Sequence, residues 1–239
     1  MSHIEINIED QVCIIKLNRP KVFNSFNKEM AFELQEILDN CEKNPSVRSI
    51  SLTAEGKAFC AGQDLQELTA PDGPKLSDIV REHYNPIIKR IRSIEKPIVC
   101  AVNGVAAGAG ASIALACDMV LAADSASFIQ SFSKIGLVPD AGSSWILPRR
   151  VGIARAMGLA LTATPLSAAD AEAWGLIWKH YEDNALLPAA QALADQLASG
   201  PTAAFAATKM LMLHAETTDF DTQLDQEARA LKSCAISPD

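Results

Sequence analysis

Two glycine-punctuated apolar stretches constrain the fold of this chain more than any other feature. The first, residues 103–112 (NGVAAGAGAS), is mostly glycine and alanine and leads into a predicted helix. The second, residues 135–142 (IGLVPDAG), places one carboxylate, that of Asp140, among uncharged residues. Small residues let a ligand approach backbone N–H groups closely, and a carboxylate with apolar neighbours is poorly solvated. Together the stretches predict a site where amides stabilise an enolate oxygen and Asp140 moves the proton.

Composition limits the classes of protein to which the chain can belong. Its 239 residues are 49% hydrophobic, which is enough for one large core. The net charge is −8 and no basic run carries interleaved aromatic residues, so nucleic acid is disfavoured as a partner. The six cysteines are scattered without a C-x-x-C pair, and the N-terminus carries no basic-then-apolar signal segment. We therefore expect a cytoplasmic protein with free thiols.

One uncharged stretch, residues 98–117, contains a Gly104-x-x-x-Gly108 motif typical of contacts between membrane helices. Alanine and glycine dominate this stretch, Pro97 precedes it, and Asn103 lies within it. This composition favours a buried strand, turn and helix over a membrane span, and we expect no membrane partner.

Hydrophobic periodicity predicts a layered α/β fold in which a strand, strand and helix unit recurs. Asn27 and Asp64 stand where they can cap helices, and Pro86 should bend or interrupt the helix that contains it. A tight turn is expected at 59–63. Strands are expected at 4–8, 12–17, 47–52, 97–102, 119–122 and 127–130. Helices are expected at 28–43, 65–68, 77–95, 112–117, 153–161, 167–174, 187–199, 203–214 and 220–233.

Several standard catalytic and cofactor motifs are absent from the sequence. It contains no G-x-S-x-G motif, and its four histidines stand in unrelated contexts, so a serine hydrolase is disfavoured. The Gly108-x-Gly110 pair lacks the third glycine of a dinucleotide-binding motif. No cluster of His, Asp and Glu has the spacing of metal ligands. We therefore expect neither a metal nor a redox cofactor.

Five motifs, taken in order, resemble those of the crotonase superfamily of enoyl-CoA hydratases and isomerases, and the match extends over about residues 4–230. They are Asn18-Arg19-Pro20, residues 59–65 (FCAGQDL), residues 101–104 (AVNG), Cys117-Asp118 and residues 136–139 (GLVP). The resemblance implies a spiral of ββα turns over residues 1–185 and a C-terminal helical oligomerisation region over residues 186–239. It also implies assembly as a homotrimer or a dimer of trimers. The ligand it implies is an acyl thioester of coenzyme A, which belongs to the substrate and is not a cofactor.

The resemblance assigns roles to individual residues. The backbone N–H groups of Gln63 and Ala109 are expected to form the oxyanion hole that receives the thioester oxygen. Coenzyme A is expected to lie against Lys21, Val22, Ser25, Ala61, Gln63, Asp64 and Leu65. Asp64 also has an ordinary structural interpretation, as the cap of a short helix.

The chain departs from water-adding members of the superfamily at the two positions where they carry catalytic glutamates. Ser112 stands at the first position and Phe132 near the second, so no carboxylate there can activate water. Asp140 instead stands where the hydratases have glycine and some isomerases have an acid. One carboxylate suffices to remove a proton from the carbon α to the thioester and return it to the γ carbon. Its apolar neighbours, among them Leu137 and Val138, should raise its pKa.

A narrower resemblance is to the isomerases of this superfamily that convert a ring epoxide to an oxepin thioester in phenylacetate breakdown. It rests on Tyr84-Asn85-Pro86, residues 103–110, residues 132–140 and Trp174-Gly175. Residues 141–144 (AGSS) differ from the more glycine-rich turn of that group. The basic tail common in the group does not follow here, so phosphate contacts from such a tail are not assigned.

Two other functions stay open at this point. One is an enoyl-CoA hydratase whose acids are displaced to Glu67 or Asp140. The other is a non-catalytic binding protein on the crotonase scaffold, including one that binds RNA, against which the net charge of −8 argues.

Overall fold

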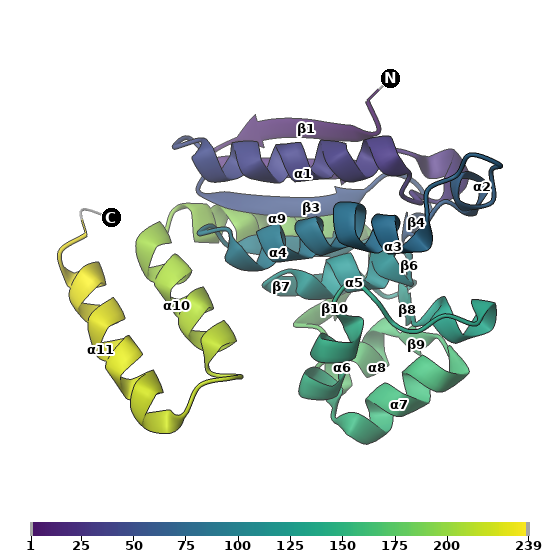
Figure 1. Cartoon of the computed structure of the whole chain (residues 1–239). Coiled ribbons are helices and arrows are strands. Elements are labelled where there is room, and N and C mark those ends of the chain that lie inside the picture. The colour runs from purple at the N-terminus through teal and green to yellow at the C-terminus, as the bar shows by residue number, and fades with distance from the viewer. Residues whose placement is uncertain (1, 238–239) are drawn as a thin grey trace.

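Two β-sheets organise the fold (Figure 1). The computed structural model describes residues 2–237. Within them, the larger sheet has six strands in the order β1 (Ile4–Glu9), β2 (Val12–Leu17), β3 (Ser49–Ala54), β5 (Ile98–Val102), β7 (Met119–Ala123) and β10 (Lys179–Tyr181). The smaller described sheet has the order β4 (Ala58–Cys60), β6 (Val105–Ala107), β8 (Ser127–Ile129) and β9 (Leu166–Ser167). The β1–β2 and β8–β9 pairs are antiparallel, and the pairs that involve β3 to β7 are parallel.

Helices connect and cover the strands. They are α1 (Lys28–Lys43), α2 (Leu65–Leu68), α3 (Leu76–Asp78), α4 (Asn85–Ser93), α5 (Ala109–Ala116), α6 (Ser143–Val151), α7 (Ile153–Thr162), α8 (Ala168–Ala173), α9 (Asp183–Ala198), α10 (Thr202–His214) and α11 (Phe220–Ala235). Short 3₁₀ turns occur at η1 (Pro20–Val22) and η3 (Ser131–Ile135), and a π-helical segment at η2 (Ile79–Tyr84).

Three successive strand pairs each place one strand in each sheet. The pairs are β3 with β4, β5 with β6, and β7 with β8, and the first member of each lies in the larger sheet. Helices follow β4 and β6 directly along the chain, and η3 and α6 follow β8. This recurrence confirms the predicted α/β fold with a repeated strand, strand and helix unit.

Local sequence signals act as predicted at the N-terminal end. Residues of β1 and β2 pair in one continuous register that sets Ile4 opposite Leu17. The Asn27 side chain caps α1 by accepting a hydrogen bond from the Met30 N–H at 3.1 Å. The apolar face of α1, which includes Leu34, is buried against the sheet.

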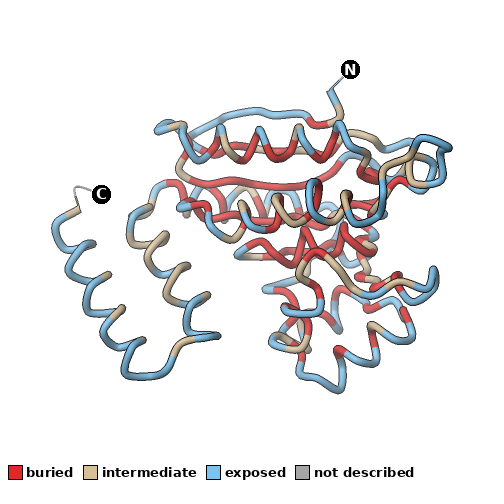
Figure 2. The backbone as a smooth tube through the Cα atoms, in the orientation of Figure 1, coloured by how far each residue is buried: buried red, intermediate tan, exposed pale blue. Residues whose placement is uncertain are grey.

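The core lies in the sheets and in the helices that face them (Figure 2). Every residue of β5 and of α5 is buried. The α5 sequence, AGASIALA, offers almost no polar face, so it can be enclosed on all sides. Its first turn is tightly packed, because a Cβ at Gly110 would lie 2.4 Å from the carbonyl oxygen of Cys60. Glycine at position 110 therefore lets β4 and the start of α5 approach each other closely.

One segment differs from the expectation and a second follows it. The turn predicted at 59–63 begins as strand β4, because Phe59 is fully buried and the strand pairs with β6. The helix predicted over 77–95, which Pro86 is expected to bend or interrupt, consists of α3, η2 and α4 in direct succession. Pro86 lies in the first turn of α4, where its missing N–H needs no helical partner, and the π-helical segment stands directly before it.

The predicted helical region 186–239 contains one helix that packs on the larger sheet and two that lie at the edge of the protein. Residues 238–239 of this region, like residue 1, lie outside the described chain. α9 packs on the larger sheet, where the Ser49 hydroxyl donates to the Ala194 carbonyl at 2.8 Å. α10 and α11 lie side by side at one edge of this body (Figure 1). Lys209 of α10 contacts the body through an ion pair with Asp118. Neither of these two helices buries a described residue. Within residues 2–237, no helix combines the length and apolar character needed to cross a membrane.

Candidate active site

Two backbone turns that are distant in the sequence lie in contact. Gly62 has a φ of +92°, which glycine adopts without strain. A Cβ at Gly62 would lie 3.0 Å from the carbonyl oxygen of Ala107 and 3.5 Å from the backbone nitrogen of Ala109. Glycine at position 62 is therefore what allows the turn after β4 to approach the start of α5.

The N–H groups of Gln63 and Ala109 stand at this junction, and both residues line one cavity. The Phe26 N–H donates to the Gly62 carbonyl at 2.7 Å, and the Asp64 N–H donates to the Phe26 carbonyl at 2.8 Å. These two bonds hold the turn on either side of Gln63. Ala109 begins α5, and the first N–H groups of a helix have no partner within it. In the described part of the chain, neither N–H has a hydrogen-bond acceptor.

The cavity at this junction has a volume of about 270 Å³ and a largely apolar wall. It is lined by Ala61, Gly62, Gln63, Leu65, Leu68, Leu76, Ile79, Tyr84, Gly108, Ala109, Ser131, Phe132, Lys134, Ile135, Leu137 and Asp140. Of these described residues, Asp140 alone carries a carboxylate. An apolar cavity with a few polar groups at one side suits an apolar ligand that is oriented by its carbonyl group.

The loop after η3 brings Asp140 to the cavity. Positive φ values of +48° at Ala141 and +82° at Gly142 turn the chain directly after it. The backbone carbonyl of Asp140 accepts a hydrogen bond from the Ser143 N–H at 2.9 Å and lies 3.3 Å from the Ser112 hydroxyl. These contacts fix the loop through its backbone, and the Asp140 side chain lines the cavity.

The Asp140 carboxyl is poorly solvated, as predicted. Its Oδ1 atom is buried and has no hydrogen-bond partner among the described residues. Burial raises the pKa of Asp140 from 3.8 to about 6. The predicted cause is only partly right: Leu137 lines the cavity, but Val138 is 77% exposed. Walls from other segments, such as Tyr84, therefore contribute to keeping water from the carboxyl.

A chain of side-chain hydrogen bonds holds Gln63. The Tyr84 hydroxyl donates to Gln63 Oε1 at 2.8 Å, and Gln63 Nε2 donates to Glu67 Oε2 at 2.8 Å. Burial raises the pKa of Tyr84, which keeps its hydroxyl a donor. The chain ties η2 and α2 to the residue whose N–H stands at the junction. The sequence offered Tyr84 only as part of a motif, without indicating this contact.

The structure separates the predicted coenzyme A residues into two groups. Ala61, Gln63 and Leu65 line the cavity. Four others do not line it: Lys21, Val22, Ser25 and Asp64. The segment 21–25 nevertheless adjoins the turn after β4, where the Ala61 N–H donates a hydrogen bond to the Phe23 carbonyl at 3.0 Å.

Asp64 and Ser25 have structural partners. The Asp64 side chain caps α2 by accepting from the Gln66 N–H at 3.0 Å, and it forms an ion pair with Arg19 at 3.0 Å. Ser25 is buried, and its carbonyl also accepts a hydrogen bond from Arg19. The cap predicted for Asp64 is confirmed, and Arg19 connects the two loops.

No acid occupies the two positions at which the resemblance places the glutamates of hydratases. Ser112 is fully buried in α5, with its hydroxyl 2.6 Å from that of Ser143. Phe132 lines the cavity with its ring. Glu67 does not line the cavity and accepts hydrogen bonds from the Gln63 side chain and from the Lys28 N–H.

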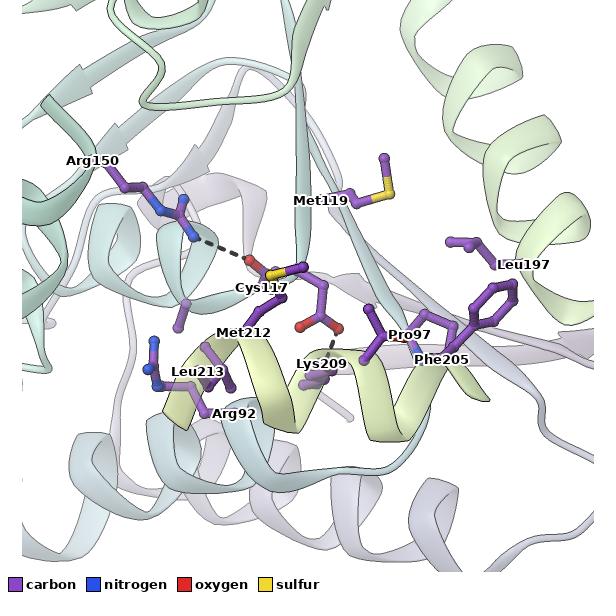
Figure 3. A pocket seen from close by; sticks show the side chains of 13 residues that line it. Arg92, Pro97, Cys117, Met119, Arg150, Leu197, Phe205, Lys209, Met212 and Leu213 are labelled. Atoms are coloured by element: carbon purple, nitrogen blue, oxygen red, sulfur yellow. Dashed lines mark hydrogen bonds and ion pairs between the residues drawn. The ribbon is translucent and has the colours of Figure 1, made fainter. Parts of the chain in front are cut away.

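A second cavity of about 290 Å³ lies between α10 and the body of the protein (Figure 3). Lys209 from α10 forms an ion pair with Asp118 at 3.0 Å and donates to the Ile91 carbonyl at 2.8 Å. Arg150 donates to the Leu176 carbonyl at 3.1 Å. Because these charged groups already have partners within the protein, this cavity offers less chemistry than the one at Asp140.

Comparison with known proteins identifies the family. The profile of the enoyl-CoA hydratase/isomerase family matches residues 7–238. The chain belongs to this family. It is 48% identical over 230 residues to the 1,2-epoxyphenylacetyl-CoA isomerase of Escherichia coli (strain K12), with 95% of this chain and 88% of that protein covered. It is 30% identical over 243 residues to the short-chain-enoyl-CoA hydratase of Clostridium acetobutylicum, with 100% and 92% covered.

Solved structures agree with this assignment. The crystal structure of an enoyl-CoA hydratase from Bacillus anthracis matches with a TM-score of 0.93 at 30% identity, and covers 100% of this chain and 93% of that one. The chain therefore has the crotonase fold and is an enzyme of the enoyl-CoA hydratase/isomerase family. Because its relatives include both isomerases and hydratases, the choice between the two reactions depends on the residues of the cavity.

Proposed function

We propose that this enzyme isomerises an acyl-CoA thioester, with 2-(1,2-epoxy-1,2-dihydrophenyl)acetyl-CoA as substrate and the oxepin thioester of phenylacetate catabolism as product. The same site would also perform a Δ3-to-Δ2 shift in enoyl-CoA thioesters. The observation that carries the proposal is Asp140, the one carboxylate among the described cavity residues, whose buried Oδ1 has no partner. The 48% identity to a 1,2-epoxyphenylacetyl-CoA isomerase supports the choice of substrate.

Proton transfer by Asp140 accounts for the shift of the double bond, which is the whole of the Δ3-to-Δ2 reaction. In the ring-epoxide substrate the bond between the two epoxide carbons also breaks, its electron pair joins the conjugated system, and the seven-membered oxepin ring results. The carboxylate removes a proton from the carbon α to the thioester, and the electron pair moves toward the thioester oxygen. The protonated carboxyl then returns the proton to a carbon farther along the conjugated system. A pKa of about 6 suits both steps, because the group is ionised near neutral pH yet is basic enough to hold the proton.

The N–H groups of Gln63 and Ala109 are proposed to stabilise the enolate oxygen. They are unpartnered backbone donors in a largely apolar cavity, where removal of one such donor typically costs about 3–4 kcal/mol of the activation barrier. The hydrogen-bonded chain from Tyr84 through Gln63 to Glu67 fixes one of these donors. The donors and the base therefore line the same cavity before the substrate binds.

Coenzyme A is proposed to extend from this cavity along the loop that contains Lys21, Val22 and Ser25. Lys21 is exposed there and can meet a phosphate group. We also propose assembly as a trimer or a dimer of trimers through α10 and α11, on which Met212 is 70% and Leu231 is 73% exposed. Light scattering of the purified protein measures this assembly.

The hydratase alternative needs a carboxylate that can activate water. The hydrogen bonds of Glu67 direct it to Gln63 and Lys28, and Ser112 is a buried hydroxyl. Asp140 by itself would have to serve both as base and as acid for the added water. A non-catalytic binding protein is disfavoured, because a binding site gains nothing from an unpartnered buried carboxyl oxygen.

The decisive experiment compares wild type, Asp140→Asn and Asp140→Ala on a 3-enoyl-CoA and on the ring-epoxide thioester. Isomerisation leaves the substrate mass unchanged, whereas hydration adds the mass of one water, so mass spectrometry separates the two reactions. We expect isomerisation by the wild type, and a loss of about 10²–10⁴-fold in kcat in both variants.

Two matched variants complete the design. Asp72→Asn changes an exposed carboxylate on the 69–75 loop and should leave kcat unchanged. Glu67→Gln tests the displaced-acid alternative and should affect kcat only modestly. Unchanged turnover in both Asp140 variants would refute the role of this residue, and faster water addition than isomerisation would favour the hydratase.

A further inference from the structure

Two cysteines from different elements meet outside the active-site cavity. The Sγ atoms of Cys13 in β2 and Cys41 in α1 lie 3.2 Å apart, although the residues are 28 positions apart in the sequence. Both side chains are buried, and both thiols are free. The Lys28 N–H at the start of α1 contacts Glu67, so Cys41 lies roughly 20 Å along the helix from the active-site end. The proposed isomerisation makes no use of this pair.

The surroundings of the two thiols make them chemically unequal. The Cys41 thiol donates its hydrogen bond to Cys13 Sγ, and the ammonium group of Lys96 lies close by, bound to the carbonyls of Cys41 and Asn44. The hydrogen bond from Cys41 and the charge of Lys96 lower the pKa of Cys13, and the same hydrogen bond together with burial raises the pKa of Cys41. Cys13 is thus the more acidic thiol of the pair, and the more readily attacked by an oxidant.

A small cavity reaches the pair. It has a volume of about 110 Å³ and is lined by both cysteines together with Ile6, Ile8 and Asn40, among others. The space admits a molecule of the size of hydrogen peroxide. A tripeptide disulfide such as oxidised glutathione is far larger than this volume. Access is therefore selective by size.

We propose that Cys13 and Cys41 form an oxidation site at which hydrogen peroxide generates an intramolecular disulfide. The Cys13 thiolate attacks one peroxide oxygen, the O–O bond breaks, and the leaving hydroxide takes up a proton to give water and Cys13 sulfenic acid. The Cys41 sulfur then attacks the sulfenic sulfur, its proton leaves with the hydroxyl as a second water, and the S–S bond forms. Two thiols lose two electrons, which reduce one peroxide to two waters. The sulfur atoms need to approach by about 1 Å to reach disulfide bonding distance.

Peptide mapping of the otherwise intact protein tests this site. In a Cys234→Ser background, which removes a partly exposed thiol, the protein is treated with hydrogen peroxide, alkylated in denaturant and digested with trypsin. We expect a product that links peptide 1–16 to peptide 29–43, two hydrogens lighter than the sum of both, which disappears on reduction with dithiothreitol. The fully buried Cys60 serves as an internal control and should be recovered as the alkylated thiol.

Variants separate the roles of the two thiols. Cys41→Ser should leave Cys13 as a sulfenic acid that dimedone traps when it is added together with denaturant, whereas Cys13→Ser should leave Cys41 reduced. Oxidised glutathione should react much more slowly than hydrogen peroxide with wild type. The proposal is overturned if both peptides are recovered alkylated after peroxide treatment, if Cys41 oxidises equally well without Cys13, or if glutathione reacts as fast as peroxide. The wild-type peptide map decides the matter even where a variant fails to fold.

Discussion

The Asp140→Asn substitution is expected to stabilise the folded protein at neutral and alkaline pH while it removes activity. The pKa of Asp140 is raised from 3.8 to about 6 because burial disfavours the charged carboxylate. The folded protein therefore holds this proton more tightly than the unfolded chain does. Stability is lost as the pH rises through the interval from about 4 to about 6, and asparagine, which carries no charge, avoids this loss.

The size of the effect follows from the shift in pKa. A shift of about two units corresponds to about 3 kcal/mol in the free energy of unfolding above pH 6. Water that enters the cavity screens the carboxylate, so we expect a gain of about 1–2 kcal/mol for asparagine at pH 8. About two thirds of the wild-type loss develops between pH 4.5 and pH 8. The remaining third develops below pH 4.5, where the folded protein is already protonated and the unfolded chain is only partly so.

Urea unfolding of wild type and Asp140→Asn at pH 4.5 and pH 8, together with kcat/KM at pH 8, measures both effects. Asp72→Asn is the control, because this exposed carboxylate should leave the free energy of unfolding unchanged at either pH. The reasoning is refuted if Asp140→Asn is no more stable than wild type at pH 8. It is equally refuted if the two proteins differ in free energy of unfolding by the same amount at both pH values. A difference in packing, which involves no charge, would produce such a constant difference.

Three further substitutions test the contacts around the site. Gly62→Ala, at a φ of +92° and 3.0 Å from a carbonyl oxygen, should move the turn away from Ala109 and lower kcat about 10-fold or more in the isomerase assay. Asp64→Ala removes the α2 cap and the partner of a mostly buried arginine, so the free energy of unfolding in urea should fall by about 2 kcal/mol. Lys209→Met leaves Asp118 without its ammonium partner and should lower the melting temperature, with a loss of about 3 kcal/mol and little change in kcat.

Elements with strong local signals are the ones that the sequence predicts well. The hairpin of β1 and β2 alternates with period two, α1 has a capping asparagine and a continuous apolar face, and Asp64 caps α2. Elements that depend on distant partners are not predicted. β4 is only three residues long and forms because β6 pairs with it. α6 contains Pro148, and proline is unfavourable inside a helix.

The candidate site shows the same division. The raised pKa of Asp140 could be predicted from its uncharged neighbours, yet part of the burial comes from residues far away in the sequence, such as Tyr84. The hydrogen-bonded chain from Tyr84 to Gln63 and Glu67 joins η2, the turn after β4 and α2. No spacing in the sequence indicates this chain, because its members meet only when the spiral has folded.

Ser112, at one of the two positions where the chain departs from the hydratases, has a structural role. Its hydroxyl lies within 3.3 Å of the carbonyl oxygens of Gly108 and Asp140 and 2.6 Å from the Ser143 hydroxyl, in a fully buried position. A glutamate there would have to place its charge in this fully buried position, next to the backbone of Asp140, and burial disfavours a charged carboxylate. The serine hydroxyl is neutral and can donate its single hydrogen to the carbonyl of Gly108 or of Asp140. A serine at position 112 therefore fits the buried position beside the loop that presents Asp140 without adding a second acid.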